Sequence, residues 1–158
     1  MVVWSVLVLA AVVLAEAAVP DPPDAGANGQ RVTAVADCTG IVAFSATQGI
    51  NDNARVVHAN LLVNKGSVYS TQTGIFTANC PGLYQFSFAG YGSTDLRLTL
   101  KQKLGKNGNW RSIVSTGPGG GANTILLDIA IGDQLAVFVE SGKIRDGTTF
   151  TGFRINSK

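Results

Sequence analysis

The chain has 158 residues, with 12 Lys and Arg against 10 Asp and Glu, one His and two Cys. This length fits one domain, or one domain with a leader, and a net charge of +2 is too small to indicate nucleic acid as a partner. The hydrophobic content of 46% excludes a disordered chain, and the 19 glycines do not recur at every third position, which excludes collagen.

Residues 1–17 are predicted to be a cleaved secretory signal peptide. The apolar run from Val2 to Ala15 is interrupted only by Ser5, and small residues follow at Ala17 and Ala18. As a helix this run would span about 21 Å, which is short of the roughly 30 Å hydrocarbon core of a bilayer. An uncleaved anchor is the alternative, but we predict no membrane span and expect a secreted, extracellular protein.

Residues 18–37 are rich in Pro, Gly and Asp and lack hydrophobic periodicity, so they are predicted to form a flexible N-terminal segment. The predicted globular domain covers residues 38–158. It holds 11 basic against 6 acidic residues, a net charge of +5. The domain is therefore more basic than the composition of the whole chain suggests.

The two cysteines, Cys38 and Cys80, are an even pair in a chain that is expected to reach an oxidising compartment. Neither belongs to a CxxC motif and no histidine cluster accompanies them, so zinc binding is not indicated. A disulfide between them would stabilise the fold by up to about 4 kcal/mol in the chain-entropy model. Two buried free thiols are the alternative.

From Cys38 onward, short segments with a period of two alternate with Gly, Asn and Asp. The segments expected to form strands are 42–45, 56–64, 67–70, 74–80, 84–88, 96–101, 110–115, 125–131, 135–140 and 149–155. Asn107-Gly108 is the strongest hairpin signal in the chain. About ten strands in about 120 residues predict an all-β antiparallel sandwich or jelly roll.

Several of these segments match one family in order and spacing. They are 42–46 (VAFSA), 62–69 (LVNKGSVY), 74–77 (GIFT), 81–88 (PGLYQFSF), 131–135 (IGDQL) and 149–153 (TFTGF). Over about residues 40 to 155 the chain resembles the C1q globular head domain of the C1q/TNF superfamily, and is most similar to short secreted, cerebellin-like members. The resemblance implies a ten-stranded antiparallel jelly roll that assembles as a homotrimer, and a non-enzymatic binding module, often of innate immunity.

The chain departs from this family in two respects. Many relatives carry a collagen stalk and this chain has none, so the resemblance does not extend to complement activation through such a stalk. Relatives bind calcium through acidic loop residues, which have no residue-by-residue match here. Calcium therefore stays open as a family property, with no metal site assigned and no other cofactor predicted.

The sequence offers no catalytic constellation. His58, the single histidine, lies in a strand-like run and is interpreted as structural, so a hydrolytic triad would lack its base. The segment 117–121 is glycine-rich but is not followed by Lys-Ser or Lys-Thr, so it is interpreted as a loop and not as a phosphate-binding site. Asp128 and Asp133 are interpreted as turn or edge residues. We therefore predict that the protein is not an enzyme.

A run of basic residues is the candidate binding site. Arg97, Lys101 and Lys103 are spaced so that they project from one face of a strand, while Lys106 and Arg111 flank the turn that follows. No acidic residue lies between Arg97 and Arg111. We expect this surface to bind anionic groups such as sulfated glycans, lipopolysaccharide phosphates or acidic surface polymers. The alternative is a solvated sheet face without a ligand.

Two functions are consistent with these observations. The first is a secreted homotrimer that recognises extracellular glycans or microbial surfaces in innate immunity, with avidity from three heads. The second is an extracellular signalling or adhesion ligand that engages a membrane receptor protein in the manner of cerebellins. Trp110, close to the basic run, is interpreted either as a core residue or as a platform for a sugar ring, which would make the protein lectin-like.

Overall fold

The structure, a computed structural model, describes residues 38–145 and 147–157, so the predicted signal peptide and N-terminal segment lie outside the described residues. The described residues form ten β-strands: β1 (Ala43–Asp52), β2 (Arg55–Lys65), β3 (Tyr69–Ser70), β4 (Ile75–Thr77), β5 (Gly82–Tyr91), β6 (Arg97–Lys103), β7 (Trp110–Ser115), β8 (Gly120–Ile129), β9 (Gln134–Ser141) and β10 (Thr149–Ser157). Within these same residues there is no helix long and apolar enough to cross a membrane.

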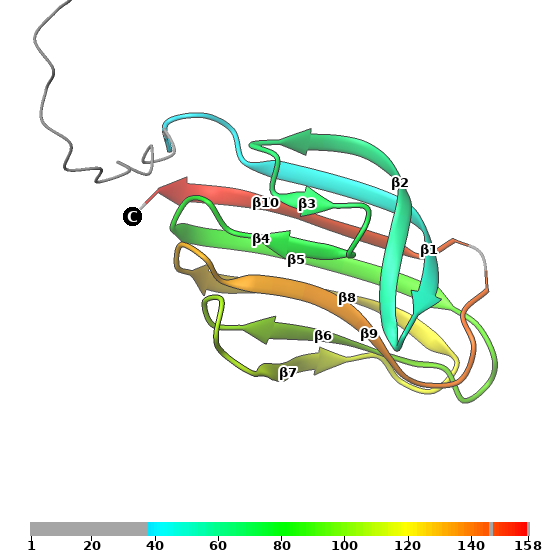
Figure 1. The fold of residues 1–158 in the computed structure, drawn as a ribbon. Helices are drawn as coiled ribbons and strands as arrows, with labels where there is room; N and C mark the ends of the chain where they lie inside the picture. The colour runs from blue at the N-terminus through cyan, green and yellow to red at the C-terminus, as the bar shows by residue number, and fades with distance from the viewer. Residues whose placement is uncertain (1–37, 146, 158) are drawn as a thin grey trace, which may run out of the picture. The chain divides into compact units, whose positions relative to one another are not determined.

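The strands pair antiparallel and form two layers (Figure 1). One layer contains β2, β1, β10, β5 and β8 in this order, and the other contains β3, β4, β9, β6 and β7. A single residue pair, Arg55 with Phe138, continues the hydrogen bonding from β2 to β9 and joins the layers. This arrangement confirms the predicted ten-stranded antiparallel jelly roll.

The core lies between the layers, and the period of two decides which side chains enter it. On β5, Tyr84, Phe86 and Phe88 are each at most 1% exposed, while the residues between them are half-buried on the outer face. The rings of Phe86 and of Phe76 on β4 meet edge-on across the layers, with 5.1 Å between their centroids. These aromatic residues are therefore buried within one chain and do not need a second copy to cover them.

Gly152 on β10 shows how tightly these rings pack. A Cβ atom at this position would lie 2.6 Å from ring atoms of both Phe44 and Phe86. Neither ring is the free end of a flexible chain, because each is held between other core residues and at most 1% exposed. Glycine is therefore required here for the close approach of aromatic side chains to the backbone of β10.

The predicted disulfide between Cys38 and Cys80 is present, with Cα atoms 5.6 Å apart. It ties the start of the described domain to the residues just before β5. Beside it, Nη2 of Arg154 on β10 donates hydrogen bonds to the carbonyl oxygens of Cys38 and Gly40. The chain that leads into β1 is thus held by one covalent bond and one guanidinium.

The predicted hairpin also forms, and it connects β6 to β7. Its loop runs from Leu104 to Asn109, with the left-handed backbone conformation at Gly105, where φ is 60°, and not at Asn107. Gly108 is needed for a different reason, because a Cβ there would lie 2.4 Å from the carbonyl oxygen of Leu104. The loop is therefore longer than the two-residue turn that an Asn-Gly pair most often makes.

The loop predicted over residues 117–121 is only partly correct. Gly120 already belongs to β8 and pairs with Tyr91 at the end of β5. A Cβ on Gly120 would lie 2.2 Å from the carbonyl oxygen of Gly90 on that strand. The glycines thus allow two strands to approach closely, which a composition-based loop prediction does not anticipate.

His58 is a buried structural residue, as predicted. It is 1% exposed, and its ring lies beside those of Tyr69 and Phe150. The Tyr69 hydroxyl accepts a hydrogen bond from the His58 backbone N–H (3.3 Å) and lies 3.0 Å from Nδ1. Burial lowers the pKa of His58 from 6.5 to about 4 and raises the pKa of Tyr69 to about 12. The imidazole is therefore neutral at physiological pH.

Candidate ligand-binding face

Strand β6 carries the predicted basic residues on the outer side of its layer, between β9 and β7. Its inward positions are the buried residues Leu98, Leu100 and Gln102, so the intervening cationic side chains point outward. Arg97 is exposed, and Lys101 and Lys103 are half-buried. The structure thus brings Arg97, Lys101 and Lys103 to one face, as the sequence predicts, and Lys106 is exposed in the loop at its end. We call these four residues the basic face.

Lys101 differs from its neighbours because an acidic residue lies beside it. Its Nζ is 2.7 Å from Oε1 of Glu140 on β9, and it also sits 4.8 Å from the centroid of the Phe138 ring. The sequence of β6 contains no acidic residue and so does not indicate this partner. Lys101 is consequently a partly neutralised, half-buried member of the basic face.

Arg111 does not extend the basic face. It pairs with Gln102, whose side chain points inward, and its Nη2 donates a hydrogen bond of 2.7 Å to Oε1 of Gln102. Nε2 of Gln102 in turn donates to Oδ2 of Asp133 over 3.2 Å. Arg111 is itself exposed, and its guanidinium begins a chain of hydrogen bonds that runs through a buried amide to a buried carboxylate, which is a structural role.

Asp133 ends that chain of hydrogen bonds and also fixes two turns. Its carboxylate is 5% exposed and accepts hydrogen bonds from the backbone N–H of Gly105 (3.0 Å) and of Ala130 (3.1 Å). The β6–β7 loop, which contains Lys106, is thereby tied to the β8–β9 turn. Sequence reasoning interpreted Asp133 as a turn residue, which is correct, but did not show that it anchors a second loop.

Trp110 lies beside the basic face, opposite Lys103 across the β6–β7 pair. Its ring meets the ring of Phe138 edge-on at 5.2 Å, and it is half-buried. One side of the indole is thus packed on the outer surface of the sheet while part of it is open to solvent. Trp110 therefore packs in a small cluster on the outer surface, and its role as a platform for a sugar ring stays a prediction.

The outer surface of the other layer has the opposite character. Its three central cross-strand rows are Ala43, Phe153, Gln85 and Leu126; Ser45, Thr151, Ser87 and Thr124; and Thr47, Thr149, Ala89 and Ala122. None of these side chains is charged, and Phe153 and Leu126 are 40% and 56% exposed. We call these three rows the uncharged face. A broad surface of this kind is typical of a protein–protein contact.

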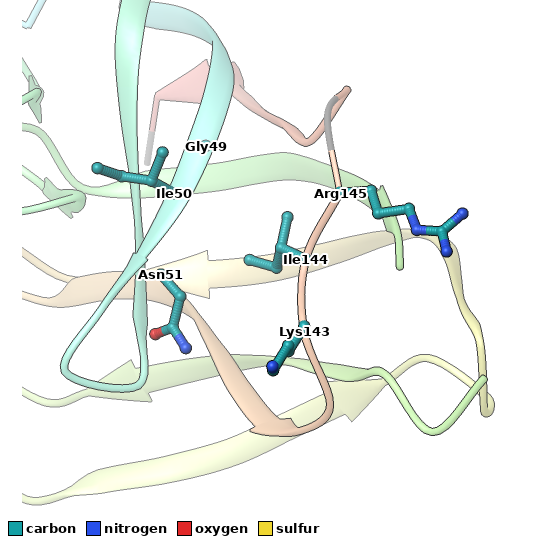
Figure 2. A pocket seen from close by; sticks show the side chains of 6 residues that line it. All are labelled: Gly49, Ile50, Asn51, Lys143, Ile144 and Arg145. Carbon is teal, nitrogen blue, oxygen red and sulfur yellow. The ribbon is translucent and has the colours of Figure 1, made fainter. Parts of the chain in front are cut away.

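A pocket of about 240 Å³ opens at the end of the domain near the end of β1, lined by Gly49, Ile50, Asn51, Lys143, Ile144 and Arg145 (Figure 2). Ile144 projects into it, while Arg145 points away from Ile50 and Asn51. None of its lining residues is a histidine, cysteine or acid that could act as a nucleophile or base. Elsewhere in the part of the chain that the structure describes, no three His, Cys, Asp or Glu side chains converge as metal ligands.

The family model for the C1q domain matches residues 41–155 of this chain. The chain belongs to the C1q domain family. The globular domain of the zebrafish complement 1qA protein is 23% identical, with a TM-score of 0.60, over 75% of this chain and 100% of its own. The predicted family is therefore confirmed, together with the jelly-roll fold.

Two TNF-type structures are similar as well. Eiger TNF from S. frugiperda is 13% identical with a TM-score of 0.57, over 75% of this chain and 94% of its own. Murine APRIL is 12% identical with a TM-score of 0.59, over 73% and 100%. No curated protein sequence matches this chain. At such identities these structures show the shared C1q/TNF fold alone.

Proposed function

We propose that this C1q-domain protein is a secreted, non-enzymatic recognition module that binds anionic extracellular polymers on its basic face, as a homotrimer acting in innate immunity. One observation carries the proposal. Arg97, Lys103 and Lys106 reach solvent and have no acidic partner within 4.0 Å among the described residues. Cationic groups that share one face and are not neutralised raise the local concentration of anions.

The spacing of these cations favours an extended ligand. Arg97 and Lys103 stand at the two ends of β6, about 20 Å apart at the usual rise of a strand. A single small anion cannot contact both ends at once, whereas a sulfated glycan or another acidic polymer can follow the strand. Trp110 beside Lys103 offers an aromatic edge to a sugar ring of such a polymer.

The uncharged face supports the homotrimer. Exposed Phe153 and Leu126 lie in one row with Ala43 and Gln85, and Lys65 of β2 continues this row beyond Ala43. Covering the uncharged residues of the row with a second copy removes apolar surface from water. The basic face lies on the other layer, so self-association through the uncharged face leaves it open. Three basic faces on one particle would turn weak single contacts into useful avidity.

Light scattering tests the assembly. We expect the mass of three chains for the purified protein, and a smaller particle after Phe153→Glu, which places a charge in the uncharged face. Ile50→Glu is the control, because Ile50 is 62% exposed at the end of β1 and outside the uncharged face. A monomeric wild type, or equal effects of the two changes, would contradict the homotrimer.

A ligand screen tests recognition and separates it from the receptor-ligand alternative. We expect the purified protein to bind heparin, lipopolysaccharide and whole bacteria, with binding that weakens as salt is raised. Failure to bind any of them, together with capture of one specific membrane protein from cell surfaces, would favour the extracellular signalling or adhesion ligand. Both outcomes are measured as binding and do not depend on catalytic activity.

A further inference from the structure

Two loops at one end of the domain are joined into a single tip. The β6–β7 loop and the β8–β9 turn touch, since a Cβ on Gly132 would lie 3.9 Å from Cα of Gly105. The buried carboxylate of Asp133 binds the backbone N–H of Gly105 and that of Ala130, one from each loop. Figure 1 shows both connections at the same end of the two layers. We call residues 103–106 and 130–133 the tip.

The tip exposes one large apolar side chain from each loop. Leu104 is 51% exposed and Ile131 is 60% exposed. Each is the chain neighbour of one of the two glycines that touch, Gly105 and Gly132, so both belong to the same joined pair of loops. Isolated exposed apolar residues are ordinary, but two of them on adjoining loops that a buried carboxylate fixes in place make a small rigid apolar projection.

Cationic residues flank this projection. Lys103 and Lys106 lie on either side of Leu104 in the chain, and neither has an acidic partner among the described residues. The acidic residue of the tip, Asp133, is buried and its oxygens accept hydrogen bonds from Gln102, Gly105 and Ala130. The side chains that the tip presents to solvent are therefore apolar at Leu104 and Ile131 and positive at Lys103 and Lys106.

We propose that the tip docks on a membrane surface that carries anionic lipid headgroups, with Leu104 and Ile131 entering the interfacial region and Lys103 and Lys106 contacting the headgroups. This partner fits because an anionic membrane surface contacts both the apolar side chains and the lysines. A soluble polyanion engages the lysines and leaves the apolar pair in water, and an apolar protein partner gains nothing from the lysines. Apolar groups and basic residues together are what interfacial membrane binding requires.

Three copies related by a threefold axis present their tips at the same height along that axis. The gain from three copies rests on the proposed homotrimer: where its tips face along the axis, a planar membrane meets all three at once, which multiplies a weak single contact. The inference goes beyond the proposed function, because polymer recognition does not involve Leu104 or Ile131, whereas membrane docking depends on both.

Vesicle sedimentation tests the proposal with the purified full chain. We expect binding to vesicles of phosphatidylcholine with phosphatidylglycerol, and little binding to phosphatidylcholine alone. The double change Leu104→Ser and Ile131→Ser is expected to weaken binding to the acidic vesicles by about tenfold or more, because two large apolar side chains no longer enter the interface. The same variant is expected to bind heparin as the wild type does.

The matched control is Ile50→Ser with Tyr91→Ser. Both residues are 62% exposed, and they lie at the opposite end of the strands, where Tyr91 pairs with the first residue of β8. This variant is expected to retain vesicle binding. Light scattering of both variants shows whether assembly is unchanged.

Four results would overturn membrane docking. The first two are no binding of the wild type to acidic vesicles and equal loss in the tip and control variants. The third is loss of assembly in the tip variant, which would assign Leu104 and Ile131 to a contact between copies. The fourth is acidic-vesicle binding that survives the tip variant, because the lysines alone then account for the attraction. A failure of heparin binding with intact vesicle binding would instead refute the proposed function.

Discussion

The pH dependence of stability follows from the environment of the single histidine. Two contacts hold His58 against the Tyr69 hydroxyl, which accepts a hydrogen bond from the His58 backbone N–H and lies 3.0 Å from Nδ1. Nε2 is buried and has no hydrogen-bond partner among the described residues. A second proton would place a charge among Tyr69 and Phe150 with no acidic group to balance it, which is why burial lowers the pKa of His58 from 6.5 to about 4.

Whether the free energy of unfolding rises or falls with pH depends on which state, folded or unfolded, binds the proton. Above about pH 6.5 the imidazole is neutral in both states, and between 6.5 and about 4 only the unfolded chain is protonated. Stability is therefore lost as the pH falls through this window and levels off below it. From about pH 7.5 to about pH 5 the loss in the free energy of unfolding is about 2 kcal/mol.

Urea unfolding followed by near-ultraviolet circular dichroism measures this loss, at one protein concentration and with a tag that lacks histidine. Because the chain has one histidine, no other side chain with an ordinary pKa near 6.5 contributes in this window. His58→Gln keeps a polar group opposite Tyr69 without a titrating ring, and its stability is expected to be nearly flat over the same range. A wild type that is equally flat, or a variant with the wild-type slope, would refute the reasoning.

Three further changes test the fold by the same urea assay. Gly152→Ala forces a methyl group between two core rings and is expected to lower the free energy of unfolding by about 1–3 kcal/mol or more. Gly117→Ala, which has open space around it, is expected to leave the urea midpoint unchanged, and equal midpoints of the two variants would contradict the packing argument. Replacing Cys38 and Cys80 by serine is expected to cost about 2–4 kcal/mol, and an unchanged midpoint would show that the disulfide contributes little. Asp133→Ala removes the acceptor of three hydrogen bonds and is expected to lower the free energy of unfolding by about 2–4 kcal/mol. Hydrogen exchange in the β6–β7 loop is expected to be faster in this variant, and normal protection there would contradict the anchoring role of Asp133.

The core could be predicted from the sequence because a strand repeats every two residues. Tyr84, Phe86 and Phe88 alternate with polar or small residues, and this alternation alone places them inside one sheet. The same reasoning put Arg97, Lys101 and Lys103 on one outer face, which the structure shows. Local periodicity is thus sufficient wherever a single strand decides the direction of a side chain.

The partners of the candidate site could not be predicted, because they depend on pairing between strands. Glu140 reaches Lys101 from β9, and no pattern within β6 indicates it. Arg111 was expected on the basic face, but the β6–β7 loop pairs Lys103 with Trp110 and so places Arg111 opposite inward-facing Gln102. A shift of one residue moves a side chain to the other face, and spacing along one strand carries no information about it.

The tip is a further feature that the sequence analysis missed. Ile131 continues the alternation of β8 and was assigned to that strand, but β8 ends at Ile129 and Ile131 lies exposed beyond it. Its neighbour in space, Leu104, follows β6, and only the hydrogen bonds of Asp133 bring the two loops together. Such a juxtaposition arises from tertiary structure and leaves no local signal.

The central claim is that the unpaired cations of β6 and its loop recognise an anionic polymer, and heparin affinity in two matched triple variants tests it most directly. One variant carries Arg97→Gln, Lys103→Gln and Lys106→Gln; the other carries Lys65→Gln, Lys143→Gln and Arg145→Gln and so has the same net charge. We predict a loss of about tenfold or more in the first variant and less than about twofold in the second, because position and not total charge determines binding. Equal affinities for the two variants would contradict the account.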